Sequence, residues 1–394
     1  MQGNFTYHNP TKLHFGEDAM NHLIDELKHY GPTVMLSYGG GSIKRNGIYD
    51  AVVAALKTAG KTIVEDAGVM PNPTYEKVLE GCRLVRENNV DLILAVGGGS
   101  TIDYGKGVSA SAYCEEDAWE KYWVKQGTPS CKTVAIGSVL TMVGTGSEMN
   151  GGSVITNRKA GFKLGKVFGP DLYPKFTILN PRFTMTVPQY QMVAGFFDIM
   201  SHLMEQYFAG TADCTTDYIN EGLMRSLIHA TRIAAKNPQD YEARANIMWA
   251  GMMAHNNAVG VGRSQDWTSH DIEHELSALY DCAHGAGLAV TLPANFTYVM
   301  QHDVMRFAKV AVRVWGCQMD FDHPEVTAKA GIEALRRFFI AIGMPKNFAE
   351  LGAKEEDIPK LVDSLCHGNG RPGSLTGFTT LNEEDCAAIY RLML

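Results

Sequence analysis

Long runs of apolar residues are absent from this sequence. No window approaches the roughly 18 uncharged apolar residues that a membrane-spanning helix needs. The first residues, MQGNFTYHNPTKLHFG, contain no cationic segment followed by an apolar stretch, which is the pattern of a secretory signal. We therefore expect no membrane partner and a cytoplasmic location.

Clustered positive charge and paired cysteines are absent too. The chain has 35 Lys and Arg against 43 Asp and Glu, a net charge of -8, and its basic residues are scattered. This distribution gives no footprint for nucleic acid. The eight cysteines lie far apart, with no CxxC pair that would indicate a zinc knuckle or a redox motif. We expect them to be reduced, which fits a cytosolic protein.

The 394 residues are too many for one ordinary core and are expected to form two domains. Up to about Leu179, short β-rich segments alternate with helical patterns, which is typical of parallel β-α-β units, and after Asn180-Pro181 long segments with 3.6-residue periodicity follow. We predict an α/β, Rossmann-like dinucleotide-binding domain over residues 1–183 and an all-α domain over residues 184–394, with an active-site cleft where they meet. The expected strands are 34–38, 62–65, 91–96 and 133–136, and the expected helices are 48–58, 75–87, 102–112, 189–208, 218–236, 241–257, 270–280 and 326–342.

Glycine-rich segments follow three of the expected strands. They are Gly39-Gly40-Gly41-Ser42, Gly97-Gly98-Gly99-Ser100 and the segment Thr141–Glu148, which contains Gly144-Thr145-Gly146-Ser147. Glycine loops that open a helix expose backbone N–H groups to phosphate, and the helix dipole favours its charge. None of the three matches GxGxxG or GxxxxGK[ST], and any one alone could be a tight turn. Three at successive strand ends predict a nucleotide site.

The first glycine loop continues as Ser42-Ile43-Lys44-Arg45. A carboxylate near the adenosine ribose favours NAD, whereas a cation accommodates the 2′-phosphate of NADP. The two cations therefore favour NADP(H) as the cofactor. The alternative is that Lys44 and Arg45 are ordinary solvated surface charges.

The second half contains two groups of metal-ligand residue types. Asp198 and His202 are four residues apart and share one face of an expected helix, although such a pair alone is most often a surface pair. His270, His274 and His284 fall within fifteen residues. One carboxylate with several imidazoles suits Zn²⁺ or Fe²⁺.

The same histidines leave a competing interpretation open. Residues 270–274 also fit the H-x-x-E-H pattern of inverted zinc metallopeptidases, in which Glu273 would be the catalytic base. A peptidase has no need of the glycine-rich strand ends or of the cationic segment, which argues against this alternative.

As a set, these segments resemble the iron-containing, or group III, metal-dependent alcohol dehydrogenases, especially their NADP(H)-dependent butanol dehydrogenase and aldehyde reductase branch. The resemblance covers essentially the whole chain. It rests on Pro71-Asn72-Pro73-Thr74, Gly97–Ser100 with Asp103, Gly144–Glu148, Ala194-Gly195 with Asp198, His202 and Glu205, and His270 to His284-Gly285. It implies the dehydroquinate synthase-like fold of that family, in which a Rossmann-like domain precedes an all-helical metal-binding domain, and a homodimer.

The resemblance also implies roles for individual residues. It makes Asp198, His202, His270 and His284 the metal ligands, and places His274 near the nicotinamide and the substrate, as a proton relay or only as a support for the metal site. NAD-preferring members carry an aspartate where this chain has Gly39–Ser42, which again favours NADP(H). The lysine at the ribose is Lys159 or Lys163, of which Lys159 is preferred. The expected cofactor-binding residues are Gly40, Gly41, Ser42, Lys44, Arg45, Asn72, Gly98, Gly99, Ser100, Asp103, Thr141, Thr145 and Lys159.

The predicted function is hydride transfer between NADP(H) and a primary alcohol or aldehyde of the butanol and butanal type, with Fe²⁺ or Zn²⁺ polarising the substrate oxygen. A further alternative is a lyase on the same fold. Such an enzyme would be expected to offer a Lys, Arg and His cluster for a phosphorylated substrate, and the segments around the metal residues offer little of this.

Overall fold

The computed structural model describes residues 3–210, 213–368 and 371–394. Backbone contacts divide the chain into two compact units, one over His8–Val187 and the other over Pro188–Leu394 together with residues 3–7. The division falls close to the predicted junction between residues 183 and 184. Each unit is described by itself below.

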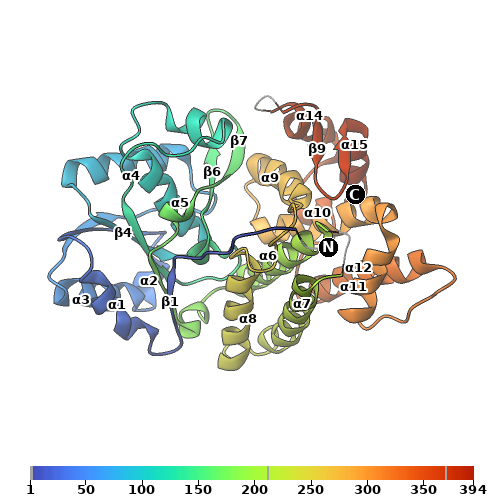
Figure 1. Cartoon of the computed structure of the whole chain (residues 1–394), viewed down its shortest axis with the longest axis horizontal. Helices are drawn as coiled ribbons and strands as arrows, with labels where there is room; N and C mark the ends of the chain where they lie inside the picture. The colour runs from blue at the N-terminus through green and yellow to red at the C-terminus, as the bar shows by residue number, and fades with distance from the viewer. Residues whose placement is uncertain (1–2, 211–212, 369–370) are drawn as a thin grey trace. The chain divides into compact units, whose positions relative to one another are not determined.

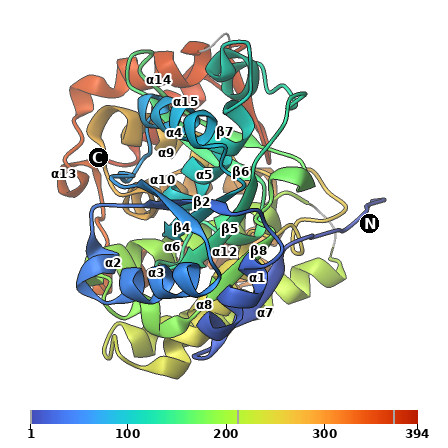
Figure 2. The same cartoon turned by 90° about the vertical axis from the view of Figure 1, so that its left-hand side faces the viewer.

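The first unit is built on a six-stranded sheet in which every paired strand is parallel. Its order is β1-β8-β5-β4-β2-β3, and Figure 2 shows β2, β4, β5 and β8 side by side. The strands are β1 (Lys12–Phe15), β2 (Thr33–Tyr38), β3 (Thr62–Asp66), β4 (Leu92–Gly97), β5 (Ala135–Leu140) and β8 (Phe176–Leu179). All six residues of β4 are buried, because a parallel sheet covered on both faces needs continuous apolar strands rather than alternating ones.

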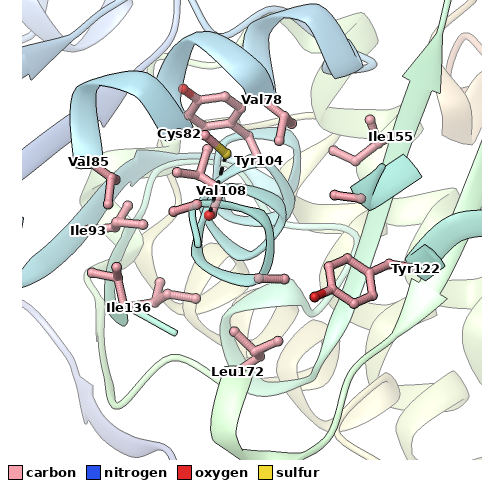
Figure 3. Close-up of a cluster of buried hydrophobic side chains, with 14 of the residues drawn as sticks. Val78, Cys82, Val85, Ile93, Tyr104, Val108, Tyr122, Ile136, Ile155 and Leu172 are labelled. Atoms are coloured by element: carbon pink, nitrogen blue, oxygen red, sulfur yellow. Dashed lines mark hydrogen bonds between the residues drawn. The ribbon is translucent and has the colours of Figure 1, made fainter. Parts of the chain in front are cut away.

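Helices cover both faces of this sheet (Figure 1). α4 (Tyr75–Asn88) and α5 (Gly99–Ser111) pack on one face, and Figure 3 shows Tyr104 and Val108 of α5 beside Cys82 of α4, with Ile93 and Ile136 from the sheet beneath. α1 (Leu23–Leu27) and α3 (Ile48–Thr58) pack on the other face, where Leu92 and Leu94 belong to the core. The short helix α2 (Ser42–Arg45) follows β2. Alternate residues of the strands thus belong to two separate hydrophobic cores, one on each face of the sheet.

The first unit differs from the sequence expectations in several details. β5 runs from Ala135 to Leu140 instead of over 133–136, so the third glycine-rich segment follows it at once. α5 begins at Gly99 and not at Ile102, so the second segment opens this helix directly. An antiparallel hairpin of β6 (Gly152–Asn157) and β7 (Phe162–Val167) was not expected. β1 and β8, which pair with each other, were not expected either.

The second unit is almost entirely helical, as predicted, and Figure 1 shows it from green to red. One small addition is a two-stranded antiparallel sheet of β9 (Ser374–Thr376) and β10 (Thr380–Asn382). Within the described residues, no helix has both the length and the apolar character that spanning a membrane requires. The helices are α6 (Gln189–Phe208), α7 (Thr215–Ala234), α8 (Tyr241–Ala254), α9 (Thr268–Tyr280), α10 (His284–Val299), α11 (Val304–Arg313), α12 (Pro324–Ala341), α13 (Phe348–Leu351), α14 (Ile358–His367) and α15 (Glu383–Arg391).

Candidate functional site

Four side chains of the helical unit converge on one point. Asp198 and His202 lie one turn apart on α6, His270 lies near the start of α9, and His284 is the first residue of α10. Asp198 Oδ1 lies 3.5 Å from Nε2 of His202, 3.8 Å from Nε2 of His270 and 3.6 Å from Nε2 of His284. The structure therefore brings together all four side chains that the sequence analysis selected as metal ligands.

This donor set fits a divalent metal ion. Asp198, His202 and His270 are buried, and among the described residues neither Asp198 Oδ1 nor His270 Nε2 has a hydrogen-bond partner. Buried polar atoms nearly always have a hydrogen-bond partner. Two unpartnered atoms this close together therefore indicate a site for a metal ion. Three imidazole nitrogens and one carboxylate oxygen match the preferences of Zn²⁺ and Fe²⁺.

Close packing of two helices positions His284 against Asp198. A Cβ atom on Gly285 would lie 1.9 Å from the carbonyl oxygen of Ala194, so only glycine lets the start of α10 approach α6 this closely. Ala194 is one helical turn before Asp198 and therefore lies on the same side of α6. The histidine next to Gly285 is brought to the carboxylate by this contact.

The carboxylate of Asp198 is held in its charged form. Burial alone would raise the pKa of Asp198, but the surrounding imidazoles of His202, His270 and His284 outweigh burial and hold it well below its usual range. Burial lowers the pKa of His202 well below its ordinary value, because the charged imidazolium is poorly solvated there. A metal requires neutral imidazoles beside an ionised carboxylate, and His202 and Asp198 meet this requirement. At His270 burial lowers the pKa, but Glu205 and Asp198 outweigh burial and raise it to about 10, so metal binding there would release a proton.

The contacts of Glu273 differ from those expected of a catalytic base in a metallopeptidase. Its side chain is fully buried, one carboxylate oxygen is hydrogen-bonded to Nδ1 of His284, and the other accepts from the Ser277 hydroxyl. A carboxylate held by these two partners is not placed to activate a water molecule, so the interpretation of Glu273 as a catalytic base is not favoured.

His274 lies beside the cluster. It follows His270 by one turn of α9, and its ring centroid is 5.5 Å from that of His284 and 6.4 Å from that of His270. The structure adds one histidine that the sequence analysis did not select, His255, whose ring is tilted against that of His202 with the ring centroids 4.3 Å apart. No local pattern marks His255, because it lies 53 residues from His202 in a segment without other ligand types.

The three glycine-rich loops of the first unit meet at one edge of its sheet. They follow β2, β4 and β5, which are neighbouring parallel strands, so their carboxyl ends lie together. The Thr141 N–H donates to the Gly97 carbonyl oxygen over 2.9 Å. A Cβ atom on Gly99 would lie 2.1 Å from Thr145 Oγ1, so glycine is required where the second loop touches the third. The strand order also reverses between β2 and β4, which is where open α/β sheets bind ligands.

A buried lysine fixes the third loop to α5. Lys106 is fully buried and donates to Ser147 Oγ (2.8 Å), Asn150 Oδ1 (3.1 Å) and the Gly152 carbonyl oxygen (2.8 Å). Asp103, one turn earlier, accepts from the Ser147 hydroxyl and from the Val154 N–H. Asp103 was expected to contact the cofactor, and in the structure both its oxygens accept hydrogen bonds from the chain.

The other expected cofactor residues lie around the same edge. Gly40 and Gly41 connect β2 to α2, Ser42 is the first residue of α2, and Asn72, with a φ of 51°, lies in the loop after β3. Ser100 is in the first turn of α5. The Lys44 ammonium lies 5.0 Å from the ring centroid of Tyr38 and 4.5 Å from that of Tyr49, and Arg45 is exposed.

The two lysine candidates lie in the β6–β7 hairpin. Lys159 is exposed in its turn, whereas Lys163 is buried on β7 and paired with Thr156. The Thr156 N–H donates to the Pro73 carbonyl oxygen, beside Asn72. Lys163 is therefore in the part of the hairpin that adjoins the Asn72 loop.

Comparison with known proteins gives matches along the whole chain. The model of the iron-containing alcohol dehydrogenase family matches residues 10–181, and the model of the C-terminal domain of Fe-containing alcohol dehydrogenases matches residues 192–394. The chain is 40% identical to NADH-dependent butanol dehydrogenase A of Clostridium acetobutylicum over 98% of both chains, and 36% identical to the NADPH-dependent aldehyde reductase YqhD of Escherichia coli over 92% of both. The crystal structure of NADH-dependent butanol dehydrogenase A from Thermotoga maritima superposes with a TM-score of 0.94 at 39% identity, over 100% of this chain and 99% of that one.

These matches confirm the predicted fold and the predicted resemblance. They establish alcohol and aldehyde oxidoreduction as the activity, and they imply a nicotinamide cofactor and a divalent metal. The geometry of the two halves agrees, with glycine loops at the sheet edge of one and a cluster of three imidazoles and a carboxylate in the other. The chain belongs to the iron-containing alcohol dehydrogenase family.

Proposed function

We propose that the protein is an NADP(H)-dependent oxidoreductase that interconverts primary aldehydes and alcohols of the butanal and butanol type. The observation that carries the proposal is the convergence of Asp198, His202, His270 and His284, whose imidazole Nε2 atoms all lie within 3.8 Å of Asp198 Oδ1. A divalent ion held by these four side chains supplies Lewis acidity toward the oxygen of the substrate.

We assign the proton transfer to His274. In aldehyde reduction, the carbon receives a hydride and the oxygen needs a proton. An imidazole titrates near neutral pH and can both hold and release that proton. Its ring lies beside those of His284 and His270, so a substrate oxygen held at the four-residue cluster would be close to this imidazole. The alternative role, support of the metal site alone, predicts lost metal in a His274→Ala variant.

The preference for NADP(H) is supported by the charges at the end of the sheet. Gly39 follows β2, so no carboxylate stands at that strand end. The nearby Asp66, at the end of β3, is buried and bound to Lys77 (2.9 Å), Ser37 (2.8 Å) and Tyr104 (2.8 Å), so it is not available to a ribose hydroxyl. Relatives differ in this respect, because their names specify NADH in some and NADPH in others.

Among the lysines, we now propose Lys163 rather than Lys159 for the cofactor. Its strand position beside the Asn72 loop supports this choice, and the exposed turn position of Lys159 does not. A Lys163→Ala variant should raise the KM for NADPH, whereas Lys159→Ala should leave it unchanged.

The metal assignment is tested by His284→Ala. We expect the variant to lose bound metal and butanal reduction together, measured by metal analysis and NADPH absorbance on the same sample. His229→Ala, which removes an exposed histidine of α7, is the matched control and should retain both. Full metal content in His284→Ala would contradict the assignment.

The cofactor assignment is tested by comparing kcat/KM for NADPH and NADH with butanal. We expect a clear preference for NADPH that falls when Lys44 and Arg45 are replaced by alanine. Equal efficiency with both cofactors would remove the case for the two cations.

We also propose a homodimer in the cytoplasm. All eight cysteines are free in the structure, which supports a reducing compartment. Analytical ultracentrifugation tests the oligomeric state.

A further inference from the structure

Two buried glutamates are hydrogen-bonded to metal-site histidines through the ring nitrogen that faces away from Asp198. Glu205 is hydrogen-bonded through Oε2 to Nδ1 of His270, and Glu273 through Oε2 to Nδ1 of His284. Both carboxylates have no exposed side-chain surface. In each case the opposite nitrogen, Nε2, is the atom that faces Asp198 Oδ1.

The two contacts follow one repeated spacing. On α6, His202 is followed three residues later by Glu205, and on α9, His270 is followed three residues later by Glu273. Neither glutamate bonds to the ligand histidine of its own helix. Each is hydrogen-bonded to a ligand histidine on another helix. Glu205 thus links α6 to α9, and Glu273 links α9 to α10.

We infer that Glu205 and Glu273 are positioning residues that hold His270 and His284 in the ring orientation and tautomer needed to present Nε2 to the metal. This inference rests on the proposed metal site. An Nδ1–H that donates to a carboxylate leaves the Nε2 lone pair free for a metal, and the negative charge makes the imidazole a stronger donor. His202 receives no such support, since its Nδ1 has no hydrogen-bond partner among the described residues.

The two carboxylates differ in their remaining contacts. Glu205 Oε1 also accepts from the backbone N–H groups of Ser269 (2.9 Å) and His270 (3.2 Å), so both oxygens are needed as acceptors. A glutamine at 205 has one acceptor oxygen and cannot replace both contacts. At 273 the second oxygen accepts from the Ser277 hydroxyl and lies near the Cys282 thiol, and the Ser277 hydroxyl can accept from a glutamine amide instead.

The test measures Zn²⁺ affinity of the apoprotein by competition with a chromophoric chelator, in Glu205→Gln, Glu273→Gln and a control. We expect Glu205→Gln to weaken binding by about 10- to 100-fold and Glu273→Gln by a smaller factor, near the lower end of that range. The control, Glu221→Gln, removes a buried carboxylate of the same unit that contacts Tyr207 and Arg313 and no histidine, and should bind Zn²⁺ like the unsubstituted protein.

A second measurement separates positioning from folding. The visible absorption of the Co²⁺-substituted protein reports ligand geometry, and it should shift in both glutamine variants but not in Glu221→Gln. If Glu205→Gln does not fold, the Zn²⁺ affinity and the Co²⁺ spectrum of Glu273→Gln alone test the inference. Zn²⁺ affinities within twofold of the unsubstituted protein, with unchanged Co²⁺ spectra, would overturn the inference. If the unsubstituted protein itself bound no Zn²⁺, Co²⁺ or Fe²⁺, the proposed metal site would fail, and the inference with it.

Discussion

Replacing Gly285 by alanine should separate metal binding from folding of the apoprotein. The new Cβ would lie 1.9 Å from the Ala194 carbonyl oxygen, which is backbone and cannot rotate away. An ordinary C···O contact is about 3.3 Å, so the start of α10 must withdraw by roughly 1.4 Å. Metal–ligand distances tolerate only about 0.2 Å. Keeping His284, the neighbouring residue, in the position of a ligand would therefore leave this contact strained.

The size of the effect follows from the cost of overpacking. Inserting a methyl group into a packed contact costs about 1–3 kcal/mol, and the apoprotein can relieve it by moving α10. The metal-bound form cannot, because the ion fixes His284 against Asp198. We therefore expect Zn²⁺ affinity to fall by about 5- to 150-fold, which is the same energy expressed as a binding ratio.

The assay is chelator competition on the apoprotein, with urea unfolding of the same samples. Gly222→Ala is the matched control, because a Cβ at this position of α7 meets no atom within 4 Å. It should bind Zn²⁺ normally and gain up to about 1 kcal/mol of stability from the better helix propensity of alanine. Unchanged Zn²⁺ affinity in Gly285→Ala would refute the argument that this helix contact positions the ligand.

Three further outcomes are expected. Gly99→Ala places a Cβ 2.1 Å from Thr145 Oγ1 and should weaken NADPH binding at least tenfold by the nucleotide's fluorescence, with metal content unchanged. Burial raises the pKa of Glu148 from 4.5 to about 7, so its contribution to the free energy of unfolding is complete below pH 4.5 and is lost as the pH rises through 7. Glu148→Gln should therefore gain up to about 3 kcal/mol relative to the unsubstituted protein between pH 4.5 and pH 8 in urea unfolding, and a constant difference would contradict this. Asp217→Asn leaves the buried Arg263 (2.8 Å) and Arg306 (2.9 Å) without their shared carboxylate and should lower the free energy of unfolding by about 3–5 kcal/mol, whereas a loss below 1 kcal/mol would count against the pairing.

Much of the fold could be predicted because it follows from local patterns. The apolar run of β4 and the 3.6-residue periodicity of α6 need no partner to be recognised, and α6 spans the expected residues 189–208. β5 was expected at 133–136 because Thr133 and Val134 favour strands, but its ladder with β4 begins at Ala135. The β6–β7 hairpin was missed because its turn has no strong two-residue signal and its strands carry buried lysines.

In the candidate site, too, local patterns could be predicted and contacts between distant residues could not. Asp198 and His202 are visible in the sequence because one helical turn separates them. The bond between Glu205 and His270 joins residues 65 apart and depends on how α6 and α9 each pack on α10, which no local pattern encodes. The H-x-x-E spacing that repeats at 202–205 and 270–273 could have suggested both glutamates as a pair.

The pairing of β1 with β8 has a consequence for how the chain is made. Lys12 lies opposite Phe176, so β1 has no partner in the sheet until synthesis of the chain has reached β8. At roughly 5–20 residues per second that interval lasts on the order of 8–33 s. During this time neither side of β1 is paired within the sheet, and its backbone N–H and C=O groups can pair with another chain.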